Sequence, residues 1–73
     1  MKLESAAFLR KAGEFLQKAQ GMLDLWPDEA GRAAYLAAFH AAQALIFERT
    51  DNSPKTHSGV HGQFARLTRD LPA

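Results

Sequence analysis

The feature that most constrains the fold of this chain is an alanine-rich segment with helix-boundary residues at both ends. Pro27 suits the first position of a helix, where its missing N–H costs nothing. Asp28 and Glu29 follow in the first turn, where the helix dipole favours negative charge. A cluster of turn-forming residues at positions 50–54 ends the segment. The pattern predicts a helix over residues 27–49, about 35 Å long at 1.5 Å per residue.

Small and large apolar residues together cover most of the surface of this predicted helix. Its alanines are Ala30, Ala33, Ala34, Ala37, Ala38, Ala41, Ala42 and Ala44. Its larger apolar residues are Leu36, Phe39, Leu45, Ile46 and Phe47. Small side chains let a neighbouring backbone approach closely, and a helix that is apolar on most sides is covered on most sides. We therefore expect this helix to lie at the centre of a bundle.

Two shorter helices are predicted around it. Along residues 5–23, apolar residues recur at intervals of three and four and form a stripe. The stripe consists of Phe8, Ala12, Phe15, Leu16, Ala19, Met22 and Leu23. This first helix ends before Pro27, because the residue preceding a proline avoids helical angles. Thr56 or Ser53 can cap a third helix over residues 57–68. Nothing predicts a strand, so the expected fold class is all-α, a short up-down bundle of three helices.

The chain makes one domain, residues 1–73, and is short for burying a large core. Near this length a lone core supplies only a few kcal/mol, and without cysteine neither disulfides nor thiolate metal sites can add to it. Two outer helices can hardly cover the middle one, so we expect a homodimer to complete the bundle. Its interface is expected to contain Tyr35, Phe39 and Gln43, or the alanine face opposite them.

Neither a membrane span nor an export signal is visible in the sequence. No run approaches the roughly 18 uninterrupted apolar residues of a membrane-spanning helix. Charged residues come too early in residues 1–15 for the apolar region of a signal peptide. We expect no membrane partner and a cytoplasmic location.

Four polar side chains lie on the helix that should be covered: Arg32, Tyr35, His40 and Gln43. Burying such a group without a partner costs about 1–3 kcal/mol, so each needs a hydrogen bond within the fold, across an interface or to a ligand. His40 is either a satisfied core histidine or a ligand-binding residue. Tyr35 and Gln43 suit packing, and Arg32 can reach solvent, pair with a neighbouring acid or contact a ligand.

Residues 53–69 form the most basic part of the chain, with three cations and two histidines but no acid. At the predicted start of the third helix, four residues can present side chains and backbone N–H groups to a phosphate. These are Lys55, Thr56, His57 and Ser58. The alternative is that these charges simply lie on a solvent-exposed surface. The patch is smaller than the basic surfaces with which proteins bind nucleic acids, which favours this alternative. His57 and His61 are one turn apart, but without a carboxylate between them or a third ligand we expect no metal site.

An ordered set of these residues resembles one protein family. Residues 32–42 read RAAYLAAFHAA, residues 54–60 read PKTHSGV, and Phe64 follows. The set resembles the HEPN domain, in the prokaryotic branch that reads roughly R-x-x-Y-x-x-x-F-H-A-A and then P-K-T-H-x-G-V. The resemblance implies a helical bundle that dimerises and is commonly encoded beside a small nucleotidyltransferase, as in toxin–antitoxin-like pairs. It also implies nucleotide binding or RNA cleavage. The candidates for ligand or phosphate binding are then Arg32, His40, Lys55, Thr56, His57 and Ser58.

The residues that cleave RNA elsewhere in this superfamily are not found here at the required spacing. Its metal-independent ribonucleases use an arginine and a histidine that are separated by four to six residues and contributed by both subunits of a dimer. Seven residues separate Arg32 from His40 and Arg49 from His57, so no catalytic residue is predicted. The chain also ends sooner after Phe64 than members of the branch usually do, so we expect a C-terminally shortened member, a fragment or the product of a disrupted reading frame.

The sequence therefore predicts a non-catalytic, HEPN-like module that uses no cofactor. We expect it to dimerise and to bind a nucleotide, RNA or a nucleotidyltransferase partner. The alternative is a metal-independent ribonuclease toxin whose active site lies across the dimer and contains Arg32, His40, Lys55 and His57. A general acid–base pair must reach the reacting oxygens, so the positions of His40 and His57 in the fold discriminate between the two functions.

Overall fold

The computed structural model describes residues 1–69, which form three α-helices and no strand. The helices are α1 (Leu3–Met22), α2 (Pro27–Thr50) and α3 (His57–Arg69). The predicted all-α class is confirmed, and each helix boundary lies within two residues of its predicted position. Residues 70–73, which complete the predicted domain, lie outside the described part of the chain.

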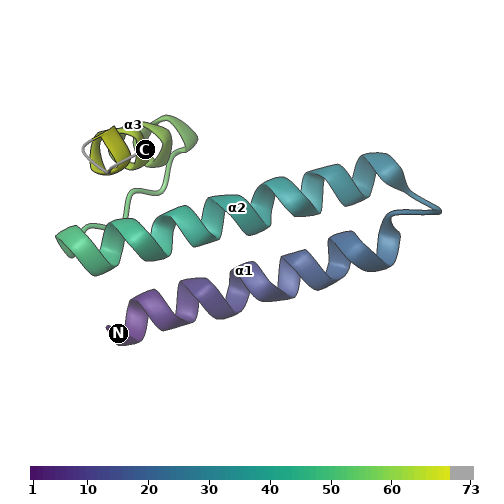
Figure 1. Cartoon of the computed structure of the whole chain (residues 1–73), viewed down its shortest axis with the longest axis horizontal. Coiled ribbons are helices and arrows are strands. Elements are labelled where there is room, and N and C mark those ends of the chain that lie inside the picture. The colour runs from purple at the N-terminus through teal and green to yellow at the C-terminus, as the bar shows by residue number, and fades with distance from the viewer. Residues whose placement is uncertain (70–73) are drawn as a thin grey trace.

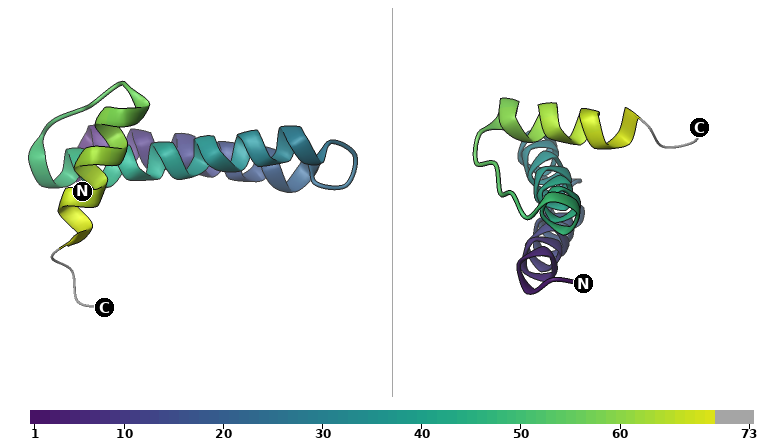
Figure 2. Two further views of the ribbon diagram at one scale, coloured as in Figure 1. Left: turned by 90° about the horizontal axis from the view of Figure 1, so that it is seen from above. Right: turned by 90° about the vertical axis from the view of Figure 1, so that its left-hand side faces the viewer.

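The long helix α2 is the central element, because it contacts both of the other helices. α1 and α2 run antiparallel as a hairpin, joined by the turn at residues 23–26 (Figure 1). α3 lies across α2 and does not contact α1 anywhere in residues 1–69 (Figure 2). The central position predicted for α2 is therefore confirmed.

α3 departs from the predicted up-down arrangement, because the loop before it turns back along α2. The buried side chain of Gln43 donates from Nε2 to the carbonyl oxygen of Pro54, at 3.2 Å. This bond brings the start of α3 beside the middle of α2. Val60, which is 1% exposed, then packs α3 against the long helix. The axis of α3 consequently crosses α2 and does not run alongside it (Figure 2).

Small residues form the seam between α1 and α2. The buried residues of α1 are Ser5, Ala12 and Ala19, which recur every seven positions. The buried alanines of α2 are Ala30, Ala33, Ala37 and Ala44. The distance between two packed helices depends on the side chains at their contact, so these small residues let the two backbones approach closely. Aromatic residues pack along one flank of the seam, where the ring centroids of Phe8 and Phe47 are 6.5 Å apart.

The apolar stripe predicted along α1 is only partly buried. Ala12 and Ala19 lie in the seam, whereas Leu16 and Leu23 are 51% and 63% exposed. Small residues occupy the line of closest approach between the helices, so the larger leucines are displaced to its edge. The hairpin therefore carries exposed leucines along one side.

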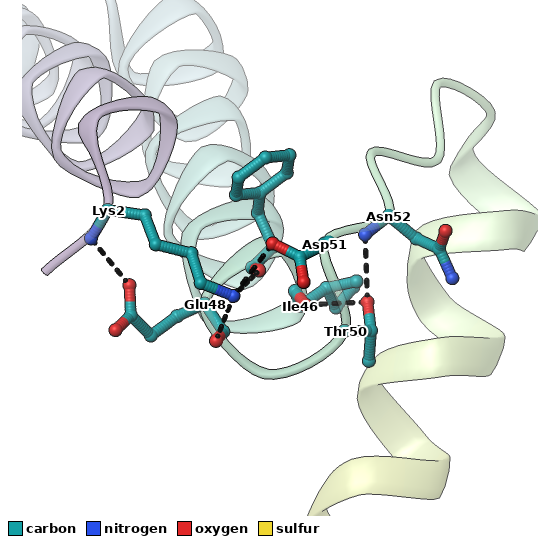
Figure 3. Close-up of polar contacts among 7 residues, drawn as sticks. Lys2, Ile46, Glu48, Thr50, Asp51 and Asn52 are labelled. Carbon is teal, nitrogen blue, oxygen red and sulfur yellow. Dashed lines mark hydrogen bonds and ion pairs between the residues drawn. The ribbon is translucent and has the colours of Figure 1, made fainter.

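Lys2, just before α1, forms hydrogen bonds and an ion pair with residues at the end of α2 (Figure 3). Its Nζ atom donates to the carbonyl oxygens of Phe47 and Glu48, at 3.3 and 2.9 Å, and pairs with the Asp51 carboxylate at 2.8 Å. Asp51 ends α2 with a left-handed φ of 60° and donates its N–H to the Phe47 carbonyl. A cation at the carbonyl end of a helix is stabilising, and here it also donates to the Glu48 carbonyl oxygen, one of the acceptors in the last turn.

Acid should weaken this junction through Glu48. The backbone N–H of Lys2 donates to Glu48 Oε1 at 3.0 Å, and this bond is the main cause that holds the pKa of the carboxyl below its ordinary value of 4.5. The nearby Ser5 hydroxyl is a smaller cause, and it makes no hydrogen bond of good geometry within residues 1–69. A carboxyl whose pKa is lower in the folded state adds stability above its unfolded pKa, and this stability is lost as the pH falls through the folded pKa.

The expected result is a melting temperature that falls more steeply in acid for the wild type than for Glu48→Gln. Circular dichroism melts between about pH 6 and pH 3 span the window in which this carboxyl becomes protonated. Glu14→Gln is the matched control, because Glu14 is exposed on α1. If Glu48→Gln and Glu14→Gln show the same pH dependence, Glu48 does not stabilise the junction through its charge.

Candidate functional site

The hydroxyl of Tyr35 lies between two histidines of α3. Its oxygen is 2.6 Å from Nδ1 of His57 and 3.1 Å from Nε2 of His61. The two histidines are one turn apart, so both reach the same point of α2 from one face of α3. The rings of Tyr35 and His57 also stack, with centroids 5.5 Å apart and planes 10° apart. We refer to Tyr35, His57 and His61 as the Tyr–His cluster.

The hydrogen bonds of the Tyr–His cluster constrain where its protons lie. A phenol hydroxyl has one proton to donate and lone pairs with which to accept. Tyr35 can therefore donate to one imidazole nitrogen, and the other imidazole bonds to the phenol oxygen by donating its own N–H. Both histidines are exposed, and Tyr35 is 39% exposed. A molecule in solution can thus reach all three side chains.

An apolar groove opens beside the Tyr–His cluster, between α2 and α3. Its volume is about 270 Å³, and it is lined by Tyr35, Ala38, Phe39, Ala42, Val60, His61 and Phe64. Of these side chains, Tyr35 and His61 carry the polar atoms, so the cluster forms the polar rim of an apolar surface. Pockets that hold drug-sized ligands have volumes of about 300–1,000 Å³. The groove therefore suits one flat ring system more than a larger molecule.

His40 is held within the fold by a chain of hydrogen bonds. Its Nδ1 atom lies 2.7 Å from Oε1 of Gln43, and the amide nitrogen of Gln43 donates to the carbonyl oxygen of Pro54. An amide oxygen can only accept, so Nδ1 of His40 carries the proton. The His40 ring is half-buried and stacks on Phe15 of α1, with centroids 5.4 Å apart. Its contacts are those of a satisfied interior histidine.

Arg32 and His40 are the two candidate ligand-binding residues that lie away from the Tyr–His cluster. The guanidinium of Arg32 is 3.6 Å from the carboxylate of Glu29, an exposed pair. Arg32 also lines a groove with Phe15 and other residues of the α1–α2 hairpin. Because His40 stacks on the same phenylalanine, both residues face α1, whereas the cluster faces α3. Arg32 and His40 are therefore not brought together with His57 in one chain.

The other four candidates lie just before α3 and in its first turn, where all are exposed. They are Lys55, Thr56, His57 and Ser58. The Thr56 hydroxyl accepts the N–H of Gly59 at 3.0 Å, which confirms Thr56 as the cap of the helix. Gly59 packs tightly there, because an added Cβ would lie 2.8 Å from Thr56 Oγ1. The cap occupies one backbone N–H of the helix start, so the side chains of Lys55 and His57 are the stronger contacts for a ligand.

The three residues expected at a dimer interface have different surroundings in one chain. Gln43 is buried, and both the oxygen and the nitrogen of its side-chain amide make hydrogen bonds within the fold. Phe39 is half-buried, and its ring centroid is 4.9 Å from that of His57. Tyr35 is the most exposed of the three and belongs to the Tyr–His cluster. Gln43 thus already has partners, whereas Tyr35 remains accessible.

Sequence reasoning missed the role of His61 in this site. The one-turn spacing of His57 and His61 indicated that they share a helix face. From the sequence, however, the pair was considered only as possible metal ligands. Their meeting with Tyr35 depends on how the loop places α3, which the spacing does not encode. Within residues 1–69, no three histidine, cysteine or carboxylate side chains gather closely enough to bind a metal ion.

Comparison with known proteins identifies a family but no individual relative. A family model described as the HEPN domain matches residues 5–72, a span that runs from the first turn of α1 to beyond the end of α3. No curated protein and no solved structure shows a significant match to the chain. Over residues 1–69, no helix combines the length and the apolar character needed to cross a membrane.

Proposed function

Because the chain belongs to the HEPN domain family, we propose that it binds a nucleotide or single-stranded RNA at the Tyr–His cluster, as a dimer and without cleaving it. Membership of the family indicates a role related to nucleotides or RNA, or a toxin–antitoxin-like role. The observation that carries the finer proposal is the exposed Tyr–His cluster at the mouth of an apolar groove.

Aromatic surface at the groove suits the flat face of a base. Tyr35 and His57 form a stacked pair, and Phe39 and Phe64 extend the apolar surface beside them. Stacking of a base on an aromatic side chain is worth about 1–3 kcal/mol and tolerates any base. A site of this kind would hold one base of a nucleotide or of a single RNA strand.

Positive charge near the groove suits the phosphate of the same ligand. Lys55 is exposed two residues before His57, and residues 53–69 contain no acid. Arg66 lines a different groove, with Thr50 and Asn52, so it is not a neighbour of the Tyr–His cluster. The local charge is small, and we therefore expect binding that salt weakens only modestly compared with proteins that cover many phosphates.

A direct test measures the binding of fluorescently labelled hexa-adenylate RNA by anisotropy, with AMP as competitor. Tyr35→Ala and His57→Ala should each weaken binding by about 5- to 150-fold, the equivalent of one lost stacking contact. Tyr35→Phe keeps the ring and should bind more nearly like the wild type. Lys11→Ala removes an exposed charge on α1 and is the control.

Two results would contradict binding at the Tyr–His cluster. One is the absence of binding by both probes at millimolar concentration. The other is an equal loss of affinity in Lys11→Ala and His57→Ala, since that pattern would indicate charge alone. The RNA should also be recovered intact. Cleavage that disappears in His57→Ala would show that the Tyr–His cluster is catalytic, which is the function of the ribonuclease alternative.

A further inference from the structure

Two imidazole nitrogens of α3 lie close to one oxygen of α2. Nδ1 of His57 and Nε2 of His61 are 2.6 and 3.1 Å from the hydroxyl oxygen of Tyr35. In a tetrahedral zinc site with bonds of about 2.0 Å, neighbouring ligand atoms are about 3.3 Å apart. The nitrogen–oxygen distances of the Tyr–His cluster therefore need to change by less than about 1 Å to suit a metal ion.

Tyr35 supplies the third ligand atom of this group. The spacing of His57 and His61 shows only two ligands, which is why no metal site was expected there. A zinc ion with three protein ligands keeps its fourth position for water. The third ligand comes from a different helix, 22 positions before His57. It is a phenol, and so it lies outside the histidine, cysteine and carboxylate side chains that do not gather in threes within residues 1–69.

Aromatic neighbours orient the imidazole of His57. The ring centroid of Phe39 is 4.9 Å from that of His57, and the ring of Tyr35 lies 5.5 Å away with its plane turned by 10°. Surroundings that fix the orientation of a ligand ring strengthen metal binding. Both histidines are exposed, so an ion can reach the three ligand atoms directly from solvent.

We propose that the Tyr–His cluster binds a divalent transition-metal ion such as Zn²⁺, through Nδ1 of His57, Nε2 of His61 and the oxygen of Tyr35. Imidazole nitrogen suits zinc, copper and nickel, whereas magnesium and calcium prefer sites made of oxygen ligands. Each imidazole binds the ion through the lone pair of the named nitrogen and carries its proton on the other ring nitrogen. The phenol proton passes to solvent. This inference goes beyond the proposed function, because the site needs no RNA.

The bound ion holds α3 against α2, because its ligands come from both helices. Protein contacts at this junction include the buried Val60 and the hydrogen bonds made by Gln43 and Tyr35. A ligand that binds the folded state more tightly than the unfolded state stabilises the folded state by mass action. The metal ion therefore stabilises the position of the third helix and takes no part in cleavage.

Nuclear magnetic resonance of the histidine rings tests the site in the wild-type chain. The chain contains three histidines, and His40, which stacks on α1, is the internal control. Titration with Zn²⁺ should shift the resonances of Nδ1 of His57 and Nε2 of His61 and leave those of His40 in place. The proposal would be overturned by an equal shift at His40, by binding through the opposite ring nitrogens, or by no shift at millimolar Zn²⁺.

Isothermal titration calorimetry measures the stoichiometry and the part played by each imidazole. The wild type should bind one Zn²⁺ per chain and no Mg²⁺ at the same concentration. His57→Ala and His61→Ala each keep a single imidazole of the pair, so both should lose saturable binding where the wild type saturates. Gln63→Ala changes another side chain of α3 and is the matched control. Unchanged affinity in either histidine variant contradicts the site.

Amide hydrogen exchange tests the ligand role of Tyr35. With free Zn²⁺ at about 100 times its dissociation constant, the protection of α3 amides should rise by up to about 100-fold. Amides of α1, which does not contact α3 within residues 1–69, should be unchanged. Tyr35→Phe keeps both imidazoles but lacks the phenol oxygen, so it should bind zinc more weakly and gain little protection. Equal gains in Tyr35→Phe and the wild type would show that Tyr35 is not a ligand, contrary to the proposal.

Zinc binding and RNA binding can fail separately. The zinc titrations contain no RNA, and the hexa-adenylate measurements are repeated with a metal chelator present. A chain that binds zinc at the Tyr–His cluster but binds no RNA would support this inference and remove the proposed ligand. A chain that binds RNA in chelator and shows no response to zinc would support the proposed function and overturn the metal site.

Discussion

Replacing Ile46 by alanine should lower the free energy of unfolding by about 2–5 kcal/mol. Ile46 is 0% exposed and is among the largest fully buried side chains of the chain. Most of the remaining core consists of alanine, so few neighbouring side chains can move into the cavity that the substitution leaves. A core of this size contributes only a few kcal/mol in total. Much of the Ile46→Ala protein should therefore be unfolded without denaturant.

Urea denaturation followed by far-ultraviolet circular dichroism measures this loss. Ile46→Val removes one methylene and should cost about 0.5–1.5 kcal/mol. Leu3→Ala is the control at a surface position, because Leu3 is 87% exposed. If Ile46→Ala were no more destabilised than Leu3→Ala, the interior of the protein would not be organised around Ile46.

Helix boundaries could be predicted because the signals for them are local. Pro27 and the acids after it fix the start of α2, and the turn-forming residues at 50–54 fix its end, whatever the rest of the chain does. The hydroxyl of Thr56 is likewise a local signal, and it caps α3 as expected. The helix ends that are set by residues next to them in the sequence could therefore be predicted from the sequence alone.

The placement of α3 could not be predicted, because it depends on contacts between distant residues. Gln43 holds the carbonyl of Pro54, eleven positions away, and Tyr35 meets His57, which is 22 positions away. The family resemblance put Tyr35 and His57 in one ordered set, yet it did not show that their side chains touch. The contact of Lys2 with the end of α2 likewise joins residues that are far apart in the sequence.

The division of α1 into buried alanines and exposed leucines also could not be predicted from the sequence. Apolar periodicity shows which side of a helix is apolar, but it does not show where the partner helix makes its closest approach. In this hairpin the approach follows Ser5, Ala12 and Ala19, so Leu16 remains at the surface. The leucines that the pattern assigned to the core are thus available to another chain.

Replacing Val60 by aspartate should detach α3 from α2 and leave the α1–α2 hairpin folded. Val60 is the single buried residue in α3 over residues 57–69. Burying an unpaired carboxylate costs several kcal/mol, more than the roughly 1.5–3 kcal/mol that burial of one valine side chain contributes. Because α3 does not contact α1 within residues 1–69, its release does not disturb the seam of the hairpin.

Amide hydrogen exchange distinguishes this local release from global unfolding. In Val60→Asp, the amides of α3 should lose their protection while those of α1 and of residues 30–44 keep theirs, and RNA binding at the Tyr–His cluster should be lost. Ala65→Asp places the same charge at an exposed position of α3 and should leave both measurements unchanged. Loss of protection throughout the hairpin would show instead that α3 is required for the fold of α1 and α2. In that case the Tyr–His cluster would contribute to the stability of the whole domain, since its side chains form hydrogen bonds between α2 and α3.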